Sequence, residues 1–167
     1  SLNGIAGDTL HVSNLLNYQD GICNTMMDCG GNVSVSSGFD GGTGTLVFNG
    51  TTDQSFNLTN ATSYFNGDIK VNKAGGKVRL LSPLIMDYNG QRLIFQKGLI
   101  VSTSSELLTL GDNVVASGAS DSSFVLGPVS KIGNDVFTFP IGTNDSLYAP
   151  LRISAPSLVT DKFVAEY

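Results

Sequence analysis

A string of short, closely spaced apolar runs between Tyr64 and Gly111 constrains this sequence most. Apolar and polar residues alternate within each run, and a small polar turn follows it. The runs are Asp68–Val71, Lys77–Leu81, Leu84–Met86, Arg92–Phe95, Leu99–Val101 and Leu107–Leu110. None of them keeps a helical spacing of three and four for more than one turn, whereas alternation with a period of two is typical of a β-strand. The stretch therefore predicts short strands and an all-β fold.

Similar runs recur along the same stretch. DIKVN at Asp68–Asn72 resembles RLIFQ at Arg92–Gln96, and KVRLLS at Lys77–Ser82 resembles ELLTLG at Glu106–Gly111. A repeat of about 20 to 25 residues with two or three short strands fits one coil of a solenoid, in which each coil buries its apolar face against the next. We therefore expect a parallel β-solenoid, β-helix-like, and an antiparallel β-sandwich is the alternative.

Changes in character along the chain predict three segments. Residues 1–40 are expected to be an irregular N-terminal segment with a cysteine loop, and 41–122 a short-strand repeat solenoid. Residues 123–167 have longer strands, and Pro128 and Pro140 suit strand starts and edges, so we expect a C-terminal strand-rich cap or the start of a next module there. The first residues have neither an initiator Met nor a signal-peptide pattern, and we expect the chain to be a piece of a longer protein.

Composition argues against two classes of partner. The formal net charge is −5, and the nine Lys and Arg are scattered, whereas a nucleic-acid interface needs a basic patch. A membrane-spanning helix needs about 18 or more consecutive apolar residues, which the sequence lacks, so no membrane insertion is expected. Charged residues make up only 14% of the chain, and the surface is expected to be polar mainly through hydroxyl and amide groups.

Two cysteines lie close together in the sequence CNTMMDC. A zinc site normally needs four ligands and the chain has one histidine, so a metal site at Cys23 and Cys29 is not expected. We favour a local disulfide between Cys23 and Cys29, with free thiols as the alternative. A disulfide would fit an oxidising, extracellular location.

Candidate catalytic residues are scarce. The chain has two glutamates, and most aspartates stand beside Gly or Asn, where an Asp usually bonds its own turn backbone. No enzyme activity and no cofactor are expected. Calcium is the one ion considered, because it takes oxygen ligands in Gly- and Asn-rich loops, and its candidate ligands are Asp40, Asp112 and Asp145. None of these loops has EF-hand spacing.

The C-terminal half carries a longer pattern, S-x-F-V-x-G-P-V-x-K-x-G-N-x-x-F-x-F-P-I-G, at Ser122–Gly142. Together with VNKAGGKVRLLSPL at Val71–Leu84, YAPLRIS at Tyr148–Ser154 and FVAEY at Phe163–Tyr167, it resembles a β-strand repeat segment of large cell-surface, adhesin-like proteins of Bacteroidetes that the type IX system secretes. The resemblance covers roughly residue 43 to the last residue. It implies an extracellular or cell-surface location and a structural or adhesive role, and it implies no catalytic residues.

These observations predict a non-enzymatic structural or adhesive module of a large secreted or cell-surface protein. Its expected partners are neighbouring modules of the same polypeptide and, in addition, extracellular polysaccharide. The alternative is a carbohydrate-binding module of a secreted polysaccharide-degrading protein. Turn-adjacent tyrosines are the stacking platforms that such a module would use, and Tyr18, Tyr64, Tyr88 and Tyr148 are the candidates.

Overall fold

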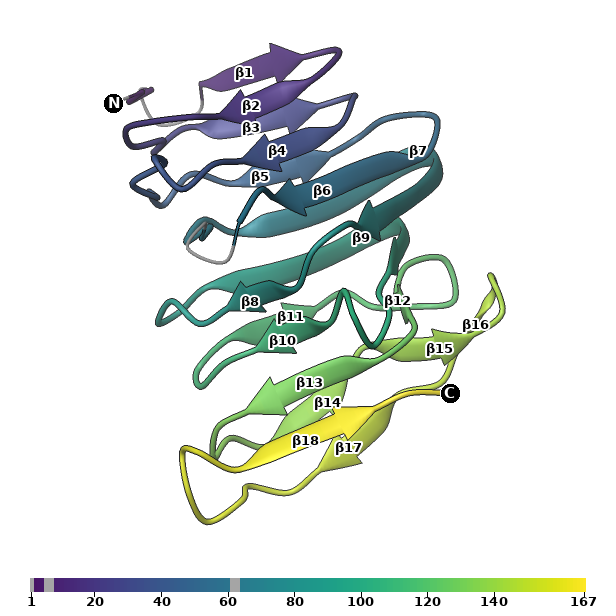
Figure 1. Cartoon of the computed structure of the whole chain (residues 1–167). Helices are drawn as coiled ribbons and strands as arrows, with labels where there is room; N and C mark the ends of the chain where they lie inside the picture. The colour runs from purple at the N-terminus through teal and green to yellow at the C-terminus, as the bar shows by residue number, and fades with distance from the viewer. Residues whose placement is uncertain (1, 5–7, 61–63) are drawn as a thin grey trace.

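The protein is a parallel β-solenoid whose coils stack along one axis (Figure 1). The fold is described from a computed structural model, which covers residues 2–4, 8–60 and 64–167. These residues form strands, turns and bends, and no helix in this part of the chain is long and apolar enough to cross a membrane. The predicted solenoid is confirmed, and the antiparallel sandwich is wrong, because neighbouring strands along the stack run parallel.

The coils present three strand-bearing faces. The first face consists of β1 (Thr9–Val12), β3 (Met26–Cys29), β5 (Leu46–Phe48), the first part of β7 (Ile69–Leu80), the first part of β9 (Arg92–Val101) and β11 (Val115–Ser117). The second face consists of β2 (Leu16–Tyr18), β4 (Val33–Val35), β6 (Gln54–Leu58), the remainders of β7 and β9, β12 (Val125–Leu126) and β15 (Ile141–Thr143). The third consists of β8 (Leu84–Met86), β10 (Leu108–Leu110) and β13 (Val129–Ile132).

The register of these strands gives the length of one coil. Leu46 pairs with Ile69, and Ile69 pairs with Leu93, so a coil takes 23 or 24 residues in the middle of the molecule. This agrees with the repeat predicted from the sequence. Equivalent residues of successive coils therefore stack directly, and alternation within each strand decides which of them face inward.

The core is built from such stacked inward residues. In β8, for example, Leu84 and Met86 are buried and Ile85 between them is exposed. One inward column runs through four coils and consists of Leu16, Val33, Phe56 and Leu80. Because no coil can bury its apolar residues alone, each coil depends on its neighbours for stability.

Two pairs of expected strands are in fact single bent strands. The runs Asp68–Val71 and Lys77–Leu81 belong to one strand, β7, whose register against β9 shifts between Val71 and Lys77. Gly76 in this bend has a φ of 66°, and a Cβ there would collide with the backbone of Thr52 in the preceding coil. The glycines read from the sequence as a turn therefore mark a bulged corner that passes from one face to the next.

The N-terminal segment is more regular than the sequence predicts. Residues 1–40 were expected to be irregular, yet β1 to β4 lie within this range and pair in parallel with later strands, as β3 does with β5. These strands are defined by parallel pairing with the following coil, as Leu16 is with Val33, and a local pattern does not contain such pairing. The parallel stack therefore begins at β1.

The C-terminal end has the strand-rich cap that the sequence predicts. Three antiparallel pairings are found there: β13 with β18 (Lys162–Ala165), β14 (Phe137–Phe139) with β17 (Leu151–Ile153), and β15 with β16 (Leu147–Tyr148). Because β18 lies against the last strand of the third face, it covers an edge that a further coil would otherwise use.

Candidate functional site

The predicted disulfide is not formed, and both cysteines are free and buried. Cys29 ends β3, and an extended strand rises about 3.3 Å per residue, so the chain between the cysteines does not form the closed loop that a Cα separation below about 7 Å requires. The Cys29 Sγ lies 3.3 Å from the carbonyl oxygen of Gly31, to which it donates. Burial raises the pKa of the Cys29 thiol, which therefore behaves as an inert core side chain.

The three calcium candidates lie in three separate places, and the carboxylates of Asp112 and Asp145 have protein partners. Asp145 forms an ion pair with Lys77, with 2.6 Å between Oδ1 and Nζ. The carboxylate of Asp112 accepts hydrogen bonds from the side chain of Asn113 and the backbone of Asn134, while Asp40 is exposed beside the Gly21 corner. Over the described ranges, no three His, Cys, Asp or Glu side chains are grouped so that they could hold a metal ion.

Acidic residues instead join one coil to the next. Asp68 accepts both the backbone N–H and the guanidinium of Arg92 in the following coil, at 2.8 and 2.6 Å. Asp53 does the same for the backbone N–H of Lys77 and for Arg79, at 2.9 and 2.8 Å. The hydrogen bond from Arg79 holds the pKa of Asp53 below its usual range. These carboxylates therefore set the spacing and register between coils.

Two buried lysines occupy inward positions of their strands, in line with the alternation that buries Val71 and Val129, where an apolar residue would be expected. Lys73 is 1% exposed, and its Nζ donates to the Thr52 carbonyl at 2.9 Å and to Gln54 Oε1 at 2.6 Å. Burial lowers the pKa of the Lys73 amine. Lys131, also 1% exposed, donates to the Gly111 carbonyl at 2.6 Å and to Asp135 at 3.1 Å. Both lysines satisfy carbonyl groups at coil corners that face the interior.

Buried glutamines have the same role at other corners. Gln91 Nε2 donates to the carbonyls of Phe65 and Gly67, at 3.0 and 2.7 Å. Gln54 Nε2 donates to the Cys29 carbonyl at 2.9 Å, and Gln54 Oε1 accepts the backbone N–H of Gly50. Since a buried carbonyl without a partner is costly, these amides hold the corners and are not free for chemistry.

The four candidate tyrosines divide into two groups. Tyr18 is buried, and burial raises its pKa, while Tyr148 is partly buried and lies 6.4 Å from the ring of Phe124. Tyr64 and Tyr88 are 44% and 49% exposed and belong to successive coils. The structure therefore leaves two of the four available as surface platforms.

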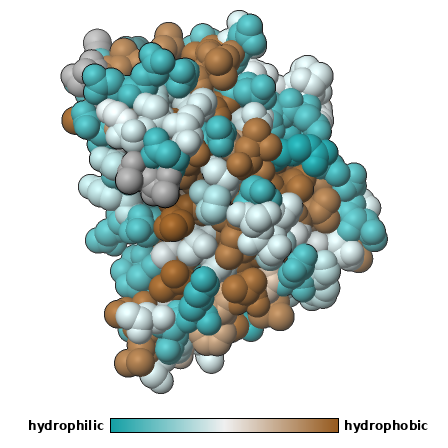
Figure 2. Space-filling model, in the orientation of Figure 1, coloured by the Kyte–Doolittle hydropathy of each residue, from teal (hydrophilic) through white to brown (hydrophobic). Residues whose placement is uncertain are grey.

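The two ends of the stack differ in how their strand edges are covered. At the N-terminal end β1 pairs only with β3 and β2 only with β4 among the described strands, so one edge of each is open. Large apolar side chains are exposed at this end: Leu2, Leu10, Leu15, Ile22 and Met26. Figure 2 shows apolar residues at the surface at this end, at the top of the view.

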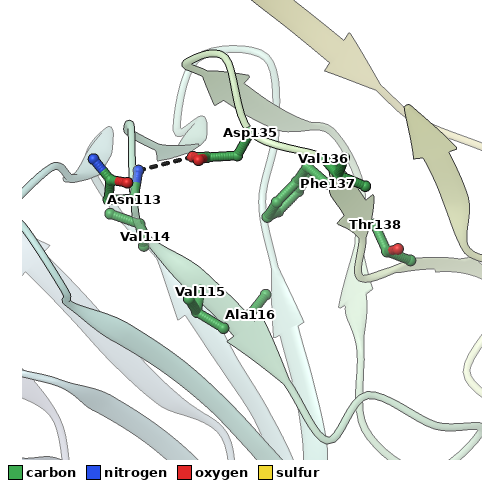
Figure 3. Close-up of a pocket in the computed structure, with 8 residues that line it drawn as sticks. All are labelled: Asn113, Val114, Val115, Ala116, Asp135, Val136, Phe137 and Thr138. Carbon is green, nitrogen blue, oxygen red and sulfur yellow. Dashed lines mark hydrogen bonds between the residues drawn. The ribbon is translucent and has the colours of Figure 1, made fainter. Parts of the chain in front are cut away.

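A groove lies between β11 and β14, where the first face meets the cap (Figure 3). It has a volume of about 400 Å³. Val115 and Ala116 line one side, and Val136, Phe137 and Thr138 line the other. Sequence reasoning did not identify this groove, because it results from the long-range pairing of β14 with β17.

Comparisons with known proteins give no match: no family model, no curated protein and no solved structure matches this chain.

Proposed function

We propose that the chain is a non-enzymatic structural or adhesive module of a large secreted or cell-surface protein, where it extends or presents other parts of that protein. The observation that carries this proposal is the N-terminal end, where no strand of the described part of the chain covers one edge of β1 and of β2, beside exposed Leu10 and Leu15. Free parallel edges next to apolar residues are what one coil offers to another. A neighbouring module of the same polypeptide is the proposed partner at this end.

The arrangement of charged groups supports a structural role. Asp53, Asp68 and Asp145 each hold a basic residue of another coil or loop, so their carboxylates are used for joining coils. Stacked coils lengthen a protein by about 4.8 Å each, which suits a spacer or stalk. Low charge and abundant hydroxyl and amide groups suit a surface in contact with polysaccharide.

Location is tested on intact cells that make the protein. Brief trypsin treatment of such cells, followed by mass spectrometry of the released peptides, is expected to recover peptides of this chain before any cytoplasmic marker. Recovery only after lysis would contradict the proposal. Trypsin has accessible targets, because Lys97 and Lys162 are exposed.

Exposed Tyr64 and Tyr88 favour carbohydrate binding as the second candidate function. Aromatic rings in the open offer an apolar face with a polar tip, as sugar rings require. A glycan array and a pull-down on insoluble polysaccharides, each with and without EDTA, test it. Specific retention that the Tyr64→Ala and Tyr88→Ala variants lose would support a binding module, and retention that is unchanged in both variants would contradict this site.

A further inference from the structure

Four Asn-Gly pairs occur in the chain, and each contains the groups for one spontaneous reaction. They are Asn3-Gly4, Asn49-Gly50, Asn66-Gly67 and Asn89-Gly90. The backbone nitrogen of the glycine can attack the side-chain carbonyl carbon of the asparagine, because glycine has no Cβ to hinder the approach. Such an intramolecular attack requires the two atoms to come within about 3–3.5 Å of each other. The fold therefore decides which of the four pairs can react.

The Asn49-Gly50 pair is held by its neighbours. The N–H of Gly50 donates to Gln54 Oε1 at 2.8 Å, and the N–H of Asn49 donates to the Cys29 carbonyl at 3.0 Å. Gly50 is buried, and a Cβ there would collide with the Gly30 carbonyl oxygen of the preceding coil. The nitrogen that would attack is therefore already bonded, and it has little room to turn toward the asparagine side chain.

The Asn66-Gly67 pair is packed against the preceding coil as well. Gly67 is buried, and a Cβ there would collide with the Gly44 carbonyl oxygen. The carbonyl of Gly67 also accepts Gln91 Nε2 at 2.7 Å. Because the reaction has to rotate the peptide between Asn66 and Gly67, it would disturb this packing. The pair can therefore react only after the corner opens locally.

The Asn3-Gly4 pair is exposed, but side chains of the next coil restrain it. Asn3 Oδ1 belongs to the amide that would be attacked, and it accepts Asn24 Nδ2 at 2.8 Å. Gly4 lies close to Thr25, because a Cβ on Gly4 would collide with Thr25 Oγ1. This pair is therefore less restrained than the two buried ones and still has to break a hydrogen bond.

The Asn89-Gly90 pair lacks restraints of these kinds. It forms the centre of the turn between β8 and β9, which the N–H of Gln91 closes by donating to the Tyr88 carbonyl at 2.9 Å (Figure 1). Gly90 has a φ of 79°, as the third residue of a type II turn has, and no atom lies within 4 Å of where a Cβ would be. Both residues are exposed. Within the described part of the chain, neither the Gly90 N–H nor the Asn89 amide has a hydrogen-bond partner.

We propose that Asn89 is a site of spontaneous covalent modification, which deamidates in the folded protein ahead of the other three asparagines, with water as the co-reactant. The Gly90 nitrogen loses its proton to solvent and bonds to Cγ of Asn89, and the side-chain amide leaves as ammonia. Water then opens the resulting succinimide at one of its two carbonyl carbons. The product is aspartate or isoaspartate, and in isoaspartate the main chain runs through the former side chain. The net change is the uptake of one water and the release of one ammonia.

The reaction changes both the charge and the backbone of this turn. Either product adds one negative charge to a chain whose formal net charge is already −5. Isoaspartate also adds one carbon to the main chain between the Tyr88 carbonyl and the Gln91 N–H, whose hydrogen bond closes the turn. Gln91 is buried, and its side chain binds the carbonyls of Phe65 and Gly67. The modification therefore lies beside a corner that joins two coils.

Peptide mapping of the full chain during storage tests the proposal. The folded protein is kept for several days in warm, mildly alkaline buffer, and samples are digested with trypsin. The peptide Leu80–Arg92 contains Asn89 as its only asparagine, and deamidation raises its mass by about 1 Da. Fragment ions locate the same change at the other three sites, and a sample digested without storage gives the background. Asn89 is expected to react about tenfold faster than Asn49 and Asn66, which need local opening, and also faster than Asn3.

The same chain unfolded in guanidinium chloride is the matched control, because all four pairs are then free. Unfolding is expected to change the rate at Asn89 by less than about threefold and to raise the rates at Asn49 and Asn66 about tenfold or more. If Asn89 in the folded protein reacts as slowly as Asn49, and if unfolding accelerates both equally, the proposal is wrong.

One variant connects the reaction with the charge of the whole protein. Native ion-exchange chromatography of the stored wild type is expected to show a growing, more acidic form. Asn89→Gln keeps an amide at this position, but the ring would have to contain one more atom and closes far more slowly. The variant is expected to form the acidic species about threefold or more slowly than wild type. Equal growth of the acidic species in both proteins would overturn the assignment to Asn89.

Discussion

The two ends of this solenoid differ in how the edges of their outermost strands are covered. The C-terminal end reverses chain direction three times, and β16, β17 and β18 lie antiparallel against strands of the last coils. The N-terminal end keeps the parallel direction, and among the described residues no strand covers one edge of β1 and one edge of β2. A reversed strand covers an edge and breaks the register that a further coil would need. The two ends therefore differ: antiparallel strands cover the strand edges at the C-terminal end, whereas no described strand covers one edge of β1 and of β2.

Opening the capped end is expected to have the largest effect. A chain that stops at Thr160 lacks β18 and exposes the edge of β13 together with the surface that Ala165 buries. With both ends open, head-to-tail association becomes possible, and an interface that does not close gives filaments. Size-exclusion chromatography with light scattering is expected to show large, concentration-dependent species.

The intact chain is the control for this experiment, and it has one open end. A truncated chain that stays monomeric and keeps the thermal midpoint of the intact chain would contradict the view that β18 acts as a cap.

Core packing is expected to differ sharply between the ends. Phe139 in the cap is fully buried, so Phe139→Ala should lower the free energy of unfolding by about 3–5 kcal/mol. Leu10 at the open end is 45% exposed, so Leu10→Ala should cost about 0.5 kcal/mol or less. Urea unfolding of both variants gives the comparison. Similar losses would mean that the N-terminal end is covered in solution.

A smaller effect is expected at the buried corner lysines. Lys73→Met leaves three oxygen acceptors, on Gly50, Thr52 and Gln54, without their cationic donor and should destabilise the protein by about 1–3 kcal/mol. Lys97→Met at an exposed position is the control and should change little. If Lys73→Met is neutral or stabilising, the corner does not need the charge.

The smallest effect is expected from pH at the cap. The backbone N–H of Asn113, followed by Lys131, lowers the pKa of Asp135 in the folded protein. The stabilisation from a lowered carboxyl pKa is fully present above the unfolded value of about 4 and is lost as pH falls through the folded value. Melting temperatures measured from pH 6 down to pH 2.5 should therefore fall less steeply for Asp135→Asn than for wild type. Parallel curves for the two proteins would mean that Asp135 does not contribute to the loss of stability at low pH.

Much of the fold could be predicted where alternation is clear. The strand Leu84–Met86 was expected from the sequence with the same bounds that the structure shows. Its inward residues, Leu84 and Met86, are apolar, so local pattern and tertiary packing agree. The repeat length followed from the same signal, because stacking forces equivalent residues to recur once per coil.

The remainder depends on contacts that no local pattern contains. Lys73 and Lys131 look like surface residues, and only the carbonyls that converge on them from other coils account for their burial. The spacing of Cys23 and Cys29 suggested a closed loop, while the intervening residues form a strand. The groove at β11 forms because β14 pairs with β17 and not with β11. The alternation of apolar residues in β14 would fit either pairing.

The cap also has a consequence for the order in which the chain can fold. In a stack each coil is stabilised mainly by the coils next to it, so a coil folds stably only when a neighbour is present. During synthesis β1 and β2 emerge before the strands of the cap. We therefore expect the first coils to gain stability only as later coils are made and pack against them.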